Sequence, residues 1–103
     1  IGLTTARIAA QRGAKLVLAA RNKEALQTLT HEINLAGGEA VSVVADVGKE
    51  EDVKKISDKA IEIFGSFDTW INNAGVSIYG KFEEVPVEDM RQLFETNYWG
   101  VVY

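Results

Sequence analysis

A short, almost wholly apolar run between two helix-patterned segments constrains the fold of this chain most. Residues 15–20 read Lys-Leu-Val-Leu-Ala-Ala, a pattern typical of a strand that is buried on both faces. Such strands occur where helices cover both sides of a parallel sheet. The run therefore predicts an α/β protein in which helices and strands alternate along the chain.

The rest of the sequence continues this alternation. Apolar residues at three- and four-residue spacings predict helices at four places: Thr4–Arg12, Asn22–Ala36, Glu50–Ile63 and from Val87 to the end of the chain. Short apolar runs predict two further strands, Ala40–Ala45 and Phe67–Ile71. Asn22 is placed to cap the second helix, and three glycines are placed to end helices: Gly13, Gly37 and Gly65.

Three of the predicted helices carry apolar stripes that we expect to face the core. In the second helix the stripe comprises Leu26, Leu29, Ile33 and Ala36. In the third helix the stripe comprises Val53, Ile56, Ala60 and Ile63. In the last helix it comprises Val87, Met90, Phe94, Tyr98 and Val101. Asn97 lies three residues from Phe94 and seven from Met90, which places it near this stripe, where an amide must be hydrogen-bonded. The alternative is a polar residue on the exposed side of the helix.

Composition sets outer bounds on function. With 47% hydrophobic and 25% charged residues and a net charge of −4, the 103-residue chain reads as one soluble globular unit. The basic residues are scattered, which argues against a nucleic-acid surface. There is no cysteine, and no apolar run is long enough to span a bilayer. We expect a cytoplasmic protein without a metal site, since His31 has no partner ligands.

The turn Asn72-Asn73-Ala74-Gly75, directly after the predicted strand Phe67–Ile71, is the most specific local feature. Gly75 allows either a close backbone approach or a positive φ, and an Asn amide can tie neighbouring strand ends together. Asn-rich turns are also ordinary loop punctuation. The position of this turn in the alternating pattern favours a functional role.

The order of these motifs resembles the short-chain dehydrogenase/reductase (SDR) family. Ile1-Gly2 looks like the end of the family's Gly-x-x-x-Gly-Ile-Gly turn, with the first strand and the earlier glycines absent. The resemblance implies a Rossmann-type doubly wound parallel sheet. It also implies that the sheet is incomplete, without its first strand and its carboxyl-terminal half. Residues 1–103 would then form a partial NAD(P)-binding Rossmann domain.

The resemblance assigns roles to individual residues. Ile1 and Gly2 would belong to the glycine-rich turn, and Asp46 and Val47 to the adenine site. Cofactor contacts on the nicotinamide side would come from Asn73, Ala74 and Gly75, with Asn72 structural. Asn97 would be catalytic, its backbone carbonyl holding a water of the proton relay. From the residues alone, Asp46 could equally order the turn before the acidic helix.

Arg21 bears on the choice of cofactor. About twenty residues beyond the glycine turn, such folds place an acidic residue for NAD or an arginine for the 2′-phosphate of NADP. This chain has Ala20-Arg21-Asn22 there, with no carboxylate. The planar guanidinium suits a phosphate, so we expect NADP(H) to be favoured over NAD(H). The alternative is a solvated arginine just past a strand.

The function that the resemblance implies is hydride transfer between NADP(H) and a small carbonyl or alcohol substrate, in a homo-oligomer. The family's catalytic acid is a Tyr followed four residues later by a Lys, and no Tyr here has that Lys. We therefore expect these residues alone to be inactive. Two alternatives remain at this stage: a non-catalytic dinucleotide-binding redox sensor, and a flavodoxin-like or receiver-type domain.

The expected strand order makes a prediction about the sheet. In a doubly wound sheet, Lys15–Ala20 and Ala40–Ala45 are parallel neighbours. The first strand would separate Lys15–Ala20 from Phe67–Ile71. No direct hydrogen-bonded ladder should therefore join these two segments.

Overall fold

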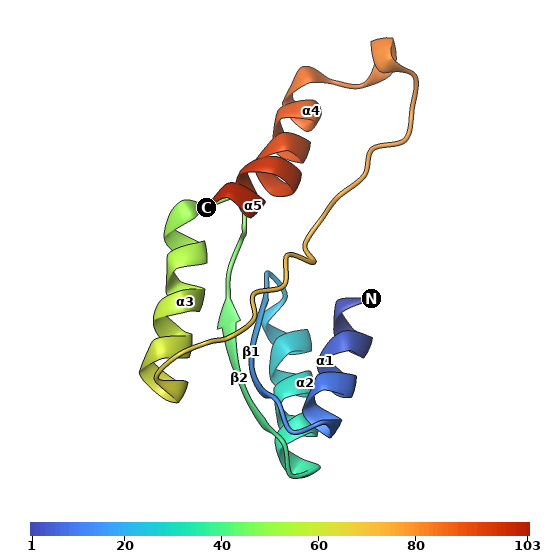
Figure 1. The fold of residues 1–103 in the computed structure, drawn as a ribbon. Coiled ribbons are helices and arrows are strands. Elements are labelled where there is room, and N and C mark those ends of the chain that lie inside the picture. Colours follow the sequence, from blue (N-terminus) through green and yellow to red (C-terminus); the bar gives the residue numbers. More distant parts are fainter.

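The computed structural model describes residues 1–103. Its elements are, in order, α1 (Gly2–Gln11), β1 (Lys15–Ala20), α2 (Lys23–Leu35), β2 (Glu39–Val44), α3 (Glu50–Phe64), a short 3-10 helix η1 (Phe82–Glu84), α4 (Val87–Phe94), a π-helical turn η2 (Glu95–Trp99) and α5 (Gly100–Val102). In Figure 1, α1 and α2 lie side by side on one side of the two strands, and α3 lies on the other. No helix is both long and apolar enough to cross a membrane.

The two strands form a parallel pair, as predicted. Their register runs from Lys15 opposite Glu39 to Ala20 opposite Val44. The second strand thus begins and ends one residue earlier than the sequence pattern indicates. A further hydrogen bond from the Ala45 amide to the Ala20 carbonyl, 3.0 Å long, holds the carboxyl ends of the strands together. Whatever follows these two strands is therefore placed at one edge of the sheet.

Local signals at the helix ends act as predicted. The Asn22 side chain accepts a 3.0 Å hydrogen bond from the Ala25 amide and so caps α2. The three predicted stop glycines, Gly13, Gly37 and Gly65, all have φ between +82° and +88°. Most other residues are strained in this left-handed region, so these glycines end α1, α2 and α3.

The best-packed part of the core lies between α2, α1 and the strands. Leu29, Ile33 and Ala40 form a buried cluster, against which small or aliphatic residues of α1 and β1 pack: Ala6, Ala10, Leu16 and Leu18. A bidentate ion pair between Arg7 and Glu32, with both N–O distances 2.7 Å, joins α1 to α2 at the surface. The expectation that β1 is buried on both faces is wrong, because its central residues are only half-buried and its ends are exposed.

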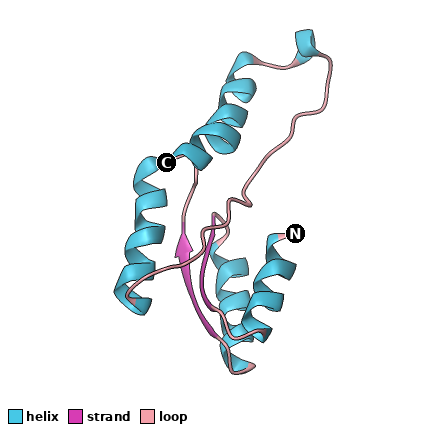
Figure 2. Ribbon diagram, viewed as in Figure 1, coloured by secondary structure: helices cyan, strands magenta, loops and turns pink.

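The expectation of a third strand at Phe67–Ile71 is also wrong. The sheet contains only β1 and β2, and Figure 2 shows the chain after α3 as a long loop that passes over the strands. An apolar run becomes a strand only when a neighbour accepts and donates its backbone hydrogen bonds. No ladder joins this segment to β1, as the doubly wound order requires.

The last predicted helix is interrupted, and its apolar stripe is not buried. The Gly100 amide bonds to the Glu95 carbonyl five residues back, which makes η2 a π-helical turn. Residues that the α-helical period of about 3.6 residues places on one face therefore do not share a face beyond this turn. Phe94 is 60% exposed and Tyr98 55% exposed, whereas the buried residues are Thr96 and Gly100.

The apolar stripe of α2 is buried at Leu26, Leu29 and Ile33 as predicted, but Ala36, the C-cap residue, is exposed. The apolar stripe of α3 is also buried over most of its length. Val53, Ile56 and Ala60 face the core as predicted. The prediction fails at Ile63, which is 47% exposed in the last turn of the helix.

Candidate functional site

Two of the predicted site residues follow neighbouring strands at the same sheet edge. Arg21 comes directly after β1, and Asp46 comes directly after the Ala45–Ala20 hydrogen bond that extends the strand pair. Arg21 is exposed, and its guanidinium takes part in no ion pair of the structure. The adjoining Asn22 oxygen is used to cap α2. Arg21 is thus the free polar group at this end of β1.

The turn at Asp46 is held by its own hydrogen bonds. The Gly48 amide donates to Asp46 Oδ1 over 3.0 Å, and the Lys49 amide donates to the Asp46 carbonyl over 3.0 Å. Asp46 therefore orders the turn before α3, which was one of the two interpretations of this residue. Its second carboxylate oxygen, Oδ2, accepts no hydrogen bond from the chain, so a ligand contact is compatible with the turn.

The amino terminus of α1 meets the Asn-Asn-Ala-Gly turn. A Cβ on Gly2 would lie 2.6 Å from Asn73 Nδ2, so the Asn73 amide can keep its present position only because residue 2 has no side chain. Ile1, the N-cap residue, provides no side-chain hydrogen bond to the helix. The amides of the first turn therefore point outward without a partner, as in helix termini that bind anions.

Asn97 reaches across to the same turn from η2. Its Oδ1 accepts a 2.8 Å hydrogen bond from the Val76 amide, and its Nδ2 donates a 2.7 Å bond to the Val76 carbonyl. A Cβ on Gly75 would lie 3.5 Å from Asn97 Oδ1, and φ of Gly75 is not positive. Since 3.5 Å is an ordinary van der Waals distance, neither a close approach nor a positive φ requires glycine at position 75 within these residues. The expectation that Asn97 lies near a buried stripe is wrong: the residue is exposed, although its Oδ1 and its Nδ2 each make a hydrogen bond.

The other amide of the turn has a local role. The Trp70 indole Nε1–H donates a 3.0 Å hydrogen bond to Asn72 Oδ1. Asn72 thus holds the segment that leads into the turn, in line with its interpretation as structural. Of the two asparagines, Asn73 is the one whose side chain faces the amino terminus of α1, at Gly2.

The π-helical turn η2 contacts both of these turns. Its Asn97 binds the segment after Asn73, while Glu95 lies against Gly48, with its Cβ 3.5 Å from the position that a Gly48 Cβ would take. Directly after η2, at the start of α5, a Cβ on Gly100 would lie 2.9 Å from Val47 Cγ2. One helical turn therefore fixes the spacing between the Asp46-Val47 turn and the Asn73–Gly75 turn.

Sequence reasoning missed two residues of this arrangement. One is Gly100, three residues after Asn97. A glycine in this aromatic-rich segment could have indicated that another part of the chain approaches closely there. Asp52 is one of three acidic residues in the first turn of α3 and was assigned no role in the site, yet its Oδ2 accepts a 3.0 Å hydrogen bond from the Asp46 amide.

Comparison with known proteins agrees with this geometry. The family model described as short chain dehydrogenase matches residues 1–103. The uncharacterized oxidoreductase YxnA of Bacillus subtilis is 59% identical over 103 residues, which are all of this chain and 29% of the relative.

Solved structures match the fold closely. An alcohol dehydrogenase from the archaeon Thermococcus sibiricus, complexed with 5-hydroxy-NADP, gives a TM-score of 0.89 at 35% identity over 94% of this chain and 42% of its own. An actinorhodin polyketide ketoreductase with NADPH gives 0.92 at 32% identity over 98% and 39%. The chain thus spans less than half the length of these relatives. It is not a flavodoxin-like or receiver-type domain; it belongs to the short-chain dehydrogenase family.

Proposed function

We propose that the protein containing this chain is an oxidoreductase that transfers a hydride between NADP(H) and a small carbonyl or alcohol substrate. Residues 1–103 would supply the binding surface for the dinucleotide. The observation that carries the proposal is the convergence on η2 of the two turns that follow the sheet, one at Asp46 and one at Asn73.

The residues present fit a dinucleotide. The uncapped amides at the start of α1 would bind the pyrophosphate, because backbone donors and the helix dipole both favour an anion there. The absence of a side chain at Gly2 keeps that end open beside Asn73. Asp46 Oδ2 would accept a hydrogen bond from the adenine amino group, with Val47 beside the ring. When bound, the nicotinamide supplies the hydride chemistry.

Asn97 would act by position. With its side chain committed to Val76, it holds the Asn73–Gly75 turn against the helix. The backbone carbonyl of Asn97 lies in η2. In this π-helical turn, amides bond to carbonyls five residues back and not four, so the carbonyls are not paired as in a regular α-helix. This supports a role in holding a relay water, while the reacting acid would come from elsewhere in the protein.

We infer that residues 1–103 form part of a larger Rossmann domain. Their accessible surface is 7534 Å², against about 5,700 Å² for a compact monomer of this mass. Their radius of gyration is 15.3 Å, against about 13 Å for a compact domain of this length. Much apolar surface is left uncovered, including Ile71, Phe82 and Val102. The identity of the substrate depends on the rest of the protein.

The cofactor preference tests the proposal directly. In the full-length protein, kcat/KM should be about tenfold to a hundredfold higher with NADPH than with NADH, because a charge-assisted phosphate contact contributes roughly 1.5–3 kcal/mol. Arg21→Ala should remove this preference. Arg12→Ala is the matched control, since Arg12 is also exposed but precedes β1, whereas Arg21 follows it.

Two outcomes would contradict this assignment. Equal kcat/KM values for the two cofactors would show that Arg21 is only a solvated residue. A preference for NADPH that survives Arg21→Ala would place the phosphate contact on another residue.

A further inference from the structure

We propose that Asp52 is a positioning residue for the adenine end of the cofactor site, an inference that rests on the proposed function. It touches no part of the ligand itself. Its carboxylate binds the backbone amide of Asp46. By fixing that backbone it sets the direction of Asp46 Oδ2, the oxygen that makes no hydrogen bond within the chain.

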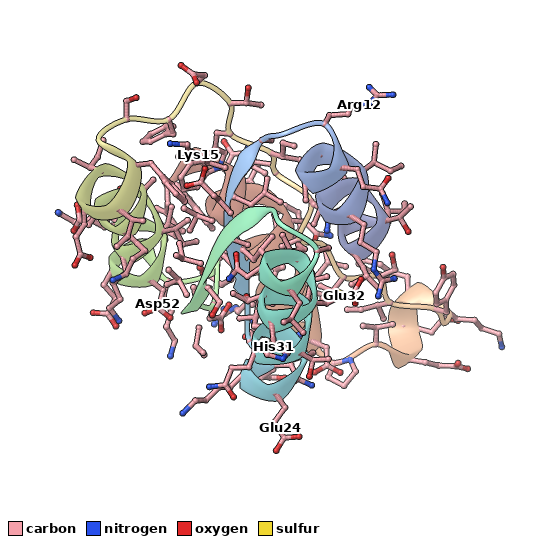
Figure 3. All side chains as sticks on the ribbon, turned by 90° about the horizontal axis from the view of Figure 1, so that it is seen from below. Arg12, Lys15, Glu24, His31, Glu32 and Asp52 are labelled. Carbon is pink, nitrogen blue, oxygen red and sulfur yellow. The ribbon has the colours of Figure 1, made fainter.

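The contacts of Asp52 are specific. One carboxylate oxygen, Oδ2, accepts from the Asp46 amide over 3.0 Å, and the other, Oδ1, pairs with Lys55 Nζ at 2.6 Å. The Asp52 side chain is only 15% exposed, whereas that of Lys55 is 60% exposed. Figure 3 shows Asp52 between α3 and the end of β2. The carboxylate is therefore held in place between a lysine at the surface and a backbone amide at the sheet edge.

The direction in which Asp52 points is unusual for its place in the helix. In a capping box, a Glu or Gln at the third position of a helix bonds back to the amide of a Ser or Thr N-cap residue. Here the N-cap Lys49 has no side-chain cap bond. The Asp52 carboxylate instead reaches six residues back, past the N-cap, to the turn that follows β2. Its hydrogen bond thus stabilises the turn more than the helix.

This bond completes the fixing of Asp46. The Asp46 amide, its carbonyl and its Oδ1 are each paired within residues 46–52. Only Oδ2 is left as an acceptor. If Asp52 is removed, the Asp46 amide loses its partner, and the backbone rotation that sets the direction of Oδ2 is no longer fixed. The charge on Asp52 is well supported, since the hydrogen bond from Lys55, together with that from the Asp46 amide, lowers its pKa.

The test separates the two ends of the dinucleotide. In the full-length protein, calorimetric titration would measure the Kd of 2′,5′-ADP, which carries only the adenosine end, and of reduced nicotinamide mononucleotide, which lacks it. Asp52→Ala should raise the Kd of 2′,5′-ADP about tenfold, the scale of one lost charge-assisted hydrogen bond. The Kd of the mononucleotide should not change. Asp52→Asn keeps an acceptor oxygen and should recover most of the affinity for 2′,5′-ADP.

Asp58→Ala is the matched control, because Asp58 lies on the same helix and pairs only with Lys54. It should leave both affinities unchanged. An equal rise in the Kd of both probes in Asp52→Ala would show a general structural role. An unchanged Kd of 2′,5′-ADP would show that Asp52 has no role in the site. Either result overturns the inference. If Asp52→Ala does not fold, Asp52→Asn decides it, with a selective rise of about threefold expected for a partly retained bond. Wild-type protein that binds neither NADPH nor 2′,5′-ADP would instead refute the proposed function.

Discussion

The first 64 residues and the residues from 66 onward are built in different ways. All eight buried apolar residues lie at or before residue 60, on α2, on α3 and in or directly after β2. After α3, only Thr96 and Gly100 are buried, and residues 66–81 contain no helix or strand. The later region is instead held by a few polar contacts, above all those of Asn97 with Val76.

The difference shows which physical forces organise each region. In the first, apolar side chains between helices and strands supply the stability, so the local sequence pattern and the packing agree. In the second, the chain keeps the small and amide residues that shape the proposed site, although little core lies beneath them. The site is thus divided between a packed half, with Arg21 and Asp46, and a half that depends on hydrogen bonds, with Asn73 and Asn97.

The largest expected effect of a single substitution is on turnover and arises in the second region. Asn97→Ala in the full-length protein should lower kcat, because loss of the two hydrogen bonds to Val76 lets η2 move and displaces the backbone carbonyl proposed to hold the relay water; the loss should approach the range of about 10²–10⁴ of a general acid–base contribution. The affinity for NADPH should change little, because the turn that carries Asn73 also touches α1 at Gly2. Steady-state kinetics and calorimetric titration of NADPH would measure the two effects separately.

Asn72→Ala is a suitable control for Asn97→Ala. Asn72 is likewise an exposed amide, but it bonds only to the Trp70 indole, so its replacement should change kcat far less. Unchanged turnover in Asn97→Ala would return Asn97 to a purely structural role. A loss of NADPH binding as large as the loss of kcat would show that the amide serves the cofactor surface and not the proton relay.

Much of the first region could be predicted from the sequence because its signals are local. A cap at Asn22, glycines with positive φ after three helices and the apolar face of α2 each depend on neighbouring residues only. The parallel pairing of β1 with β2 followed from the alternation of helices and strands. The local pattern does not show how much of each side chain other elements cover. The apolar run of β1 therefore predicted burial on both faces, whereas its residues are half-buried or exposed.

The second region could be predicted only in part, because its structure depends on partners. Phe67–Ile71 has the composition of a strand but no strand beside it. The π-helical turn at Glu95–Trp99 moves the apolar residues off the face that an α-helical period indicates. The motif Asn72–Gly75 was recognised as a unit, but its contacts with Gly2 and Asn97 join residues far apart in sequence.

A pair of core and surface substitutions would test the difference in packing. Ile33→Ala, at a buried position of α2, should lower the free energy of unfolding by about 2–5 kcal/mol through the cavity that it leaves. Phe94→Ala, at a position of α4 that is exposed in residues 1–103, should lower it by roughly 0.5 kcal/mol or less where no other part of the protein covers this side chain. Urea unfolding of both variants would measure the two values. A loss at Phe94 as large as that at Ile33 would show that the exposed face of α4 is covered in the full-length protein.

The smallest expected effect concerns the ion pair that joins α1 to α2. The bidentate hydrogen bond from Arg7 lowers the pKa of Glu32, so the pair stabilises the fold above the ordinary glutamate pKa, near 4.3, and the contribution is lost as pH falls through the lowered value. Both side chains are nearly half exposed, which keeps the gain small. Glu32→Gln should therefore reduce slightly the difference in melting temperature between pH 7 and pH 3. Glu24→Gln, on the same helix but in no ion pair and pointing outward in Figure 3, should leave that difference nearly unchanged. A Glu32→Gln variant that keeps the full wild-type difference would show that acid sensitivity arises elsewhere, with Asp52 as the other carboxylate whose pKa is lowered.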